Sequence, residues 1–152
     1  MKCIGLFSNP TQPGMGAAVD QLAQRLHQRG VEVLLADNLR PICQSDSSWF
    51  RSDEDLVEQA DILVAMGGDG TLMRAAELVH PCSTPILGVN LGRLGFLSGA
   101  EPGELDRGLD RLLGGDYSVE ERIALSAQVG TDTKTESSSP NTSGFAGFLG
   151  LC

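Results

Sequence analysis

The chain has 152 residues, the length of one ordinary domain, and 41% of them are hydrophobic, so a buried core is expected. It carries 20 acidic against 11 basic residues, and its formal net charge of −9 argues against a broad basic surface for nucleic acid. No apolar run approaches the roughly 18 residues of a membrane span, and the apolar start is too short for a signal peptide, so a cytoplasmic protein without a membrane partner is expected.

The first third of the chain predicts a strand, a helix and a second strand. Residues 2–7 form an apolar run that predicts a buried strand. Apolar residues then recur at helical spacing from Val19 to Leu26, and Gly30 stands where a left-handed cap ends a helix. Residues 31–36 predict a second strand that is covered on both faces.

The middle of the chain begins without a countable period and then returns to the same alternation. Residues 37–52 are rich in Asn, Pro, Ser and Asp and predict an irregular connection. Asp53 is expected to cap a short helix over 54–60, and residues 61–66 predict a third buried strand. A glycine-rich loop comes directly after that strand.

Further elements follow the loop in the same order. A helix is expected over 72–79, a strand over 85–89, a helix from about 102 to 114, and a strand over 117–125. Alternating strands and helices predict an α/β fold, a parallel sheet with helices on both faces. In such sheets ligands bind beyond the carboxyl ends of the strands.

The end of the chain differs in composition from the rest. Residues 130–143 are rich in Ser and Thr, and residues 144–151 form a short apolar stretch without a period. We therefore expect one domain over 1–129 and a low-complexity, largely disordered tail over 130–152, whose apolar end can dock on exposed surface.

The loop after the third strand, Gly67-Gly68-Asp69-Gly70-Thr71, is the strongest candidate site. Glycines between a strand and a helix allow positive φ and close approach of a ligand, so backbone N–H groups can face phosphate oxygens. Asp69 suits this loop if it accepts a proton from an attacking hydroxyl or holds a magnesium ion that bridges phosphates. The alternative is a tight turn with an aspartate cap.

A second segment follows the next strand at the same edge of the predicted sheet. Asn90 can bond ribose hydroxyls, Gly92 and Gly95 allow close backbone approach, and Phe96 can stack on a base or pack in the core. Taken alone, such a segment is more often a structural turn than a site.

Together these motifs resemble the NAD kinase family. The resemblance rests on MGGDGTL at 66–72, RAA at 74–76 and PILGVNLGRLGFL at 85–97. The GGDG loop is shared with diacylglycerol, sphingosine and phosphofructokinase-type kinases, whereas the second segment favours NAD kinase. The likeness covers about residues 2–129 and implies the Rossmann-like N-terminal α/β domain of that family.

The resemblance implies transfer of the γ-phosphoryl group of ATP, with Mg²⁺, to the 2′-hydroxyl of the adenosine ribose of NAD, which gives NADP. Asp69 would be the catalytic proton acceptor. The residues expected to bind NAD or the nucleotide are Gly67, Gly68, Asp69, Gly70, Thr71, Arg74, Asn90, Gly92, Gly95 and Phe96.

The family continues into an all-β domain with an Asn-Glu or Asn-Asp pair on the NAD ribose, and a neighbouring subunit completes the cleft. Nothing after Val129 corresponds to that domain, so we expect a truncated chain that is weak or inactive alone and that self-associates. Two alternatives stay open: a non-catalytic nucleotide-binding remnant, and a lipid or small-alcohol kinase of the wider GGDG group.

Overall fold

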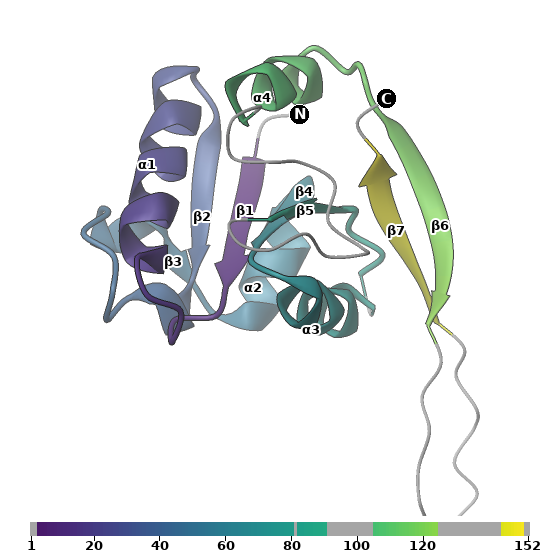
Figure 1. The fold of residues 1–152 in the computed structure, drawn as a ribbon, viewed down its shortest axis with the longest axis horizontal. Coiled ribbons are helices and arrows are strands. Elements are labelled where there is room, and N and C mark those ends of the chain that lie inside the picture. The colour runs from purple at the N-terminus through teal and green to yellow at the C-terminus, as the bar shows by residue number, and fades with distance from the viewer. Residues whose placement is uncertain (1–2, 81, 91–104, 125–143, 151–152) are drawn as a thin grey trace, which may run out of the picture.

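Seven strands form one sheet in the order β3-β2-β1-β4-β5-β7-β6 (Figure 1). The computed structural model describes residues 3–80, 82–90, 105–124 and 144–150. All pairings from β3 across to β7 are parallel, and β6 pairs antiparallel with β7. The strands are β1 Cys3–Ser8, β2 Glu32–Ala36, β3 Phe50–Arg51, β4 Ile62–Met66, β5 Ile86–Val89, β6 Ser118–Ala124 and β7 Gly144–Gly150.

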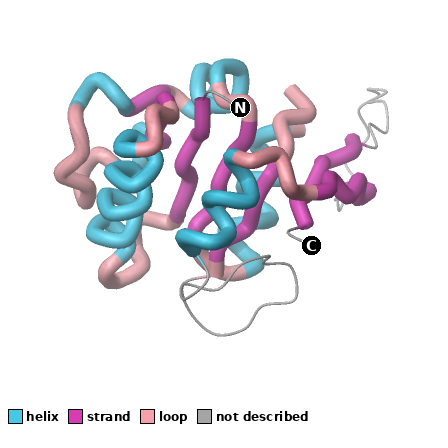
Figure 2. The backbone as a smooth tube through the Cα atoms, turned by 90° about the horizontal axis from the view of Figure 1, so that it is seen from above, coloured by secondary structure: helices cyan, strands magenta, loops and turns pink. Residues whose placement is uncertain are grey.

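Helices cover both faces of this sheet, as the alternation of elements predicts (Figure 2). They are α1 Met15–Gln28, α2 Asp53–Gln59, α3 Asp69–Val79 and α4 Leu105–Leu113. Arg25 of α1 forms an ion pair of 2.7 Å with Asp106 of α4, which ties these two helices together. The other two helices, α2 and α3, contact each other and pack on β1, β4 and β5. No helix in the described ranges is long and apolar enough to cross a membrane.

The central strands are buried along their whole length, which explains their unbroken apolar sequences. All six residues of β1 and all five of β4 are buried. Strands covered on both faces need apolar side chains at every position rather than at alternate ones. The predicted strands and helices of the first 90 residues are therefore confirmed. Most bounds differ by one or two residues, but α1 begins four residues before Val19 and α3 three residues before Leu72.

Of two predictions about helix ends, one is confirmed and one is wrong. Gly30 has φ +77°, as expected of the residue after a helix. For α2, however, the cap is Ser52 and not Asp53, because the Ser52 hydroxyl accepts the Asp55 N–H at 3.2 Å. The connection over 37–52 contains two short 3-10 helices, Asp37–Leu39 and Ser47–Trp49, and the two-residue strand β3, which the sequence analysis did not predict.

The end of the chain also differs from the prediction. Residues 144–150, expected within a disordered tail, form strand β7, which lies between β5 and β6. Ile86 of β5 pairs with Phe148, and all seven residues of β6 pair with β7. A short apolar stretch without polar interruptions suits an inner strand that is paired on both sides. These residues therefore belong to the sheet of the predicted domain, and 130–143 lie outside the described residues.

Candidate active site

The candidate site lies where β4 and β5 end side by side. Met66 of β4 pairs with Val89 of β5, so the glycine loop and Asn90 both begin at this edge. The N–H of Gly67 donates to the carbonyl of Val89 at 2.9 Å. Asn90 is buried, with 7% of its surface exposed. The structure thus brings together the first parts of the two motifs that sequence reasoning selected.

The first loop position requires a glycine for two separate reasons. Gly67 has φ +149°, a backbone conformation that L side chains rarely adopt. A Cβ atom there would also lie 2.5 Å from Oγ1 of Thr71. Thr71 is itself buried in the first turn of α3. The turn from β4 into α3 is therefore closed by a contact that leaves no room for a side chain.

The next residues of the loop form the start of α3, where the backbone is exposed. Gly68 is the N-cap and offers no side-chain cap, so the alternative of an aspartate cap at Asp69 is not what the structure shows. The N–H groups of Thr71 and Leu72 donate to the Gly68 carbonyl at 3.0 and 3.2 Å. Gly68 and Gly70 are exposed. Because the first N–H groups of a helix lack intrahelical acceptors, this end favours an anion.

Asp69 is the first residue of α3 and is half-buried. It is the acidic residue of the first turn of this helix. A carboxylate here lies beside the N–H groups that would hold a phosphate, so it can contact a hydroxyl that approaches that phosphate.

Arg74 lies on α3 beyond the loop and is exposed. Its side chain forms no hydrogen bond or ion pair with another residue of the described ranges, whereas Arg25, Arg29 and Arg40 each pair with a carboxylate. Its side chain lines a pocket of about 540 Å³ between α2 and α3. A cationic side chain that has no partner in the described part of the chain, on the helix that begins at the glycine loop, is suited to a phosphate.

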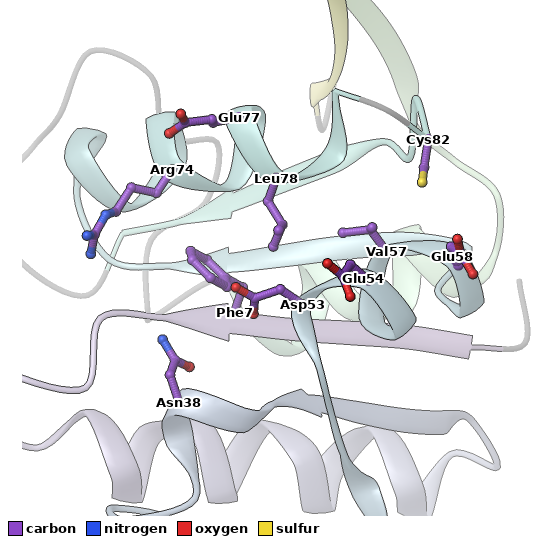
Figure 3. A pocket seen from close by; sticks show the side chains of 10 residues that line it. All are labelled: Phe7, Asn38, Asp53, Glu54, Val57, Glu58, Arg74, Glu77, Leu78 and Cys82. Carbon is purple, nitrogen blue, oxygen red and sulfur yellow. The ribbon is translucent and has the colours of Figure 1, made fainter.

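Figure 3 shows how this pocket is oriented. Arg74, Phe7 and Asn38 lie at one end, where β1 and β2 finish, and Cys82 and Glu58 lie at the other end. Val57 and Leu78 contribute apolar surface between them. The remaining lining residues are three carboxylates, Asp53, Glu54 and Glu77.

The charge of the pocket decides which part of a nucleotide it can accept. Four carboxylates and one arginine line it, so phosphate groups inside it would meet net repulsion. The start of α3 has the opposite character, because its N–H groups and helix dipole attract anions. Phosphate contacts are therefore favoured at the Gly67–Thr71 loop and at the Arg74 end, and not in the depth of the pocket.

Two residues at this edge were not predicted as part of the site. The Ser8 hydroxyl donates to the Met66 carbonyl at 2.5 Å, and the Asn38 side-chain amide donates to the Ser8 carbonyl at 3.3 Å. No periodic pattern marks either residue, and both bonds join segments far apart in the sequence. The only sequence signal was their position just after predicted strands.

Three predicted site residues, Gly92, Gly95 and Phe96, lie outside the described residues. Within the described ranges, no three His, Cys, Asp or Glu side chains form a group that could hold a metal ion. Asp69 is the acidic residue that the first turn of α3 offers next to the loop.

Comparisons with known proteins agree with the motifs. The sequence model of the ATP-NAD kinase N-terminal domain matches residues 4–117. The chain is 41% identical over 129 residues to the NAD kinase of Moorella thermoacetica, covering 85% of this chain and 41% of that protein. It is 37% identical over 129 residues to the NAD kinase of Heliobacterium modesticaldum, covering 85% of this chain and 45% of that protein.

A solved structure has the same fold. The crystal structure of yeast NADH kinase complexed with NADH matches with a TM-score of 0.66 and 18% sequence identity, over 97% of this chain and 46% of that one. The chain therefore spans less than half the length of these relatives.

Proposed function

Because the chain belongs to the ATP-NAD kinase N-terminal domain family, we propose that it takes part in transferring the γ-phosphoryl group of ATP to NAD. The acceptor is the 2′-hydroxyl of the adenosine ribose, and the products are NADP and ADP. The observation that carries this proposal is the placement of the GGDGT loop at the start of α3, beside the buried Asn90.

Asp69 is the general base in this proposal. The ribose 2′-oxygen attacks the γ-phosphorus, the bond from that phosphorus to the bridging oxygen breaks, and ADP leaves. The 2′-hydroxyl proton passes to the Asp69 carboxylate. The N–H groups of Gly68 and Gly70 and the Arg74 guanidinium hold the negatively charged oxygens. Positioning and charge stabilisation supply most of the rate in such transfers.

A magnesium ion is compatible with this donor set. Mg²⁺ is commonly held by one or two carboxylates together with substrate phosphates, and Asp69 offers one carboxylate at the phosphate-binding end of α3. When bound with ATP, the ion neutralises charge that builds up on the phosphate oxygens.

The rest of the cleft in this proposal lies beyond the described residues. Gly92, Gly95 and Phe96 border the nucleotide, and a neighbouring subunit of a homo-oligomer contributes further contacts. The chain covers 41% of the length of its Moorella relative, so we propose slow NADP formation by these 152 residues on their own. The expected cytoplasmic location stays a prediction.

The test follows NADP formation with ATP, Mg²⁺ and NAD, using an enzymatic cycling assay sensitive enough for slow turnover. We expect NADP to form only when ATP is present, and Asp69→Asn to reduce the rate by about 100-fold or more, the usual contribution of a general base. Calorimetry with NAD alone measures binding separately from turnover.

Asp110→Asn is the matched control, because Asp110 is an exposed aspartate on helix α4 that does not line the pocket. It should leave NADP formation unchanged. A wild-type chain that neither binds NAD nor forms NADP would overturn the proposal, and phosphorylation of a lipid alcohol in place of NAD would favour the wider GGDG kinase group.

A further inference from the structure

The peptide bond between Met66 and Gly67 is held at both of its polar atoms by neighbouring strands. Its oxygen accepts the Ser8 hydroxyl from β1 at 2.5 Å, and its N–H donates to the Val89 carbonyl at the end of β5 at 2.9 Å. This peptide is the point at which β4 becomes the glycine loop. Its orientation therefore sets the direction in which the loop leaves the sheet.

A glycine at this point makes the restraint necessary. Gly67 lacks a Cβ and can rotate through φ values that other residues cannot reach, so the peptide before it can turn over at low cost. Its observed φ of +149° brings the backbone against Thr71 and starts α3. Bonds at both ends of one peptide plane select this single orientation.

Ser8 is well placed to act as a fixed donor. It is fully buried and pairs directly with Met66 in the parallel register of β1 and β4. Its own carbonyl accepts the Asn38 amide, so the end of β2 is linked to the end of β1. The Ser8 hydroxyl donates to a backbone carbonyl, so its influence on the loop passes through the backbone.

We infer that Ser8 is a positioning residue for the Gly67–Thr71 loop: its hydroxyl fixes the Met66–Gly67 peptide so that the N–H groups at the start of α3 face the bound nucleotide. The inference rests on the proposed function, because the benefit of a fixed loop is seen in binding NAD. Ser8 would thus act on the site through the backbone of the loop and not through contact with a substrate.

The test compares Ser8→Ala with Thr84→Val. Thr84 is buried, and its hydroxyl also donates to a backbone carbonyl, that of Val57, at 2.8 Å. Both variants lose one buried hydrogen bond, so both should lose similar thermal stability. Only Ser8→Ala should weaken NAD binding, by about tenfold in the dissociation constant measured by calorimetry, which is the worth of one such bond.

A second readout does not depend on any ligand. The Gly67 amide hydrogen should exchange with solvent faster in Ser8→Ala than in Thr84→Val, measured by NMR on the free protein, and Ser8→Thr should restore slow exchange and NAD binding. Unchanged affinity together with unchanged exchange at Gly67 would overturn the inference. A wild-type protein that binds no NAD would overturn the proposed function instead, and the exchange comparison would then decide the role of Ser8 by itself.

Discussion

Gly67 and Thr71 are so close that a Cβ atom on Gly67 would lie 2.5 Å from the Thr71 hydroxyl oxygen. Gly67→Ala should therefore lower the free energy of unfolding by about 1 to 3 kcal/mol, through the contact and the positive φ together. Urea unfolding measures this loss. NAD affinity should fall as well, because the loop must move.

The neighbouring Gly70 supplies the control for this substitution. A Cβ at Gly70 meets nothing within 4 Å, and Gly70 is the second residue of α3. Gly70→Ala should then raise stability by up to about 0.5 kcal/mol, because alanine has the higher helix propensity and the effect is smaller in the first turn than in a helix interior. Adding Thr71→Ala to Gly67→Ala should recover part of the lost stability, since the contact is removed. Equal stability losses for Gly67→Ala and Gly70→Ala would show that the contact is unimportant.

Arg74 is expected to contribute to nucleotide affinity and not to stability. It is exposed and has no ion-pair partner among the described residues, so Arg74→Ala should leave the melting temperature unchanged. Loss of a charged contact to phosphate should weaken nucleotide binding by about ten- to 100-fold. The effect should shrink at high salt because screening weakens the interaction in the wild type.

Arg107 on α4 is an exposed arginine outside the pocket and serves as the comparison. Arg107→Ala should leave affinity unchanged in the same calorimetric titration. An equal loss of affinity in both variants would contradict the prediction. It would show that the overall charge of the protein, and not the location of Arg74, determines nucleotide affinity.

Two cysteines should make stability fall at high pH. Burial raises the pKa of the Cys3 thiol to about 11, with Glu32 and Asp61 adding to the shift, and burial and Asp20 raise that of Cys43 to about 11. Because the ordinary value is 9.0, the folded state favours the protonated thiols. Their stabilising contribution is complete below about pH 9 and is lost as the pH rises through about 11.

Urea unfolding at several pH values between about 8 and 11 measures this loss. The double variant Cys3→Ala, Cys43→Ala should show a flatter profile than the wild type. Cys82 is exposed, so Cys82→Ala should keep the steep profile. An unchanged slope in the double variant would assign the loss to other titrating groups.

The sequence predicted the central sheet because its strands have a strong local signal. β1, β4 and β5 are buried throughout, so each appears as an unbroken apolar run. The start of α3 was predictable for a similar reason: glycines at 67, 68 and 70 directly follow such a run. The prediction that loop and Asn90 share one edge followed from the rule for parallel sheets.

What could not be predicted depends on contacts between distant segments. The Ser8–Met66 bond joins residues 58 positions apart, and the Asn38–Ser8 bond spans 30. A serine at the end of a strand is also typical of a turn. The local sequence therefore does not indicate that the Ser8 hydroxyl bonds the Met66 carbonyl, and only the structure identifies this partner. Strand β7 was missed because its residues gain strand structure from pairing with both β5 and β6, a property absent from the local sequence.

The peptide plane before Gly67 also has a consequence for folding kinetics. Its two bonds come from β1 and from the end of β5, so it is complete only after three strands separated by long stretches of chain have docked. Such non-local pairings form late, because the entropy of closing the intervening loops is lost before they stabilise the chain. During refolding, nucleotide binding should therefore appear only when β5 has docked beside β4. The rate at which binding appears would then report the rate of that docking step.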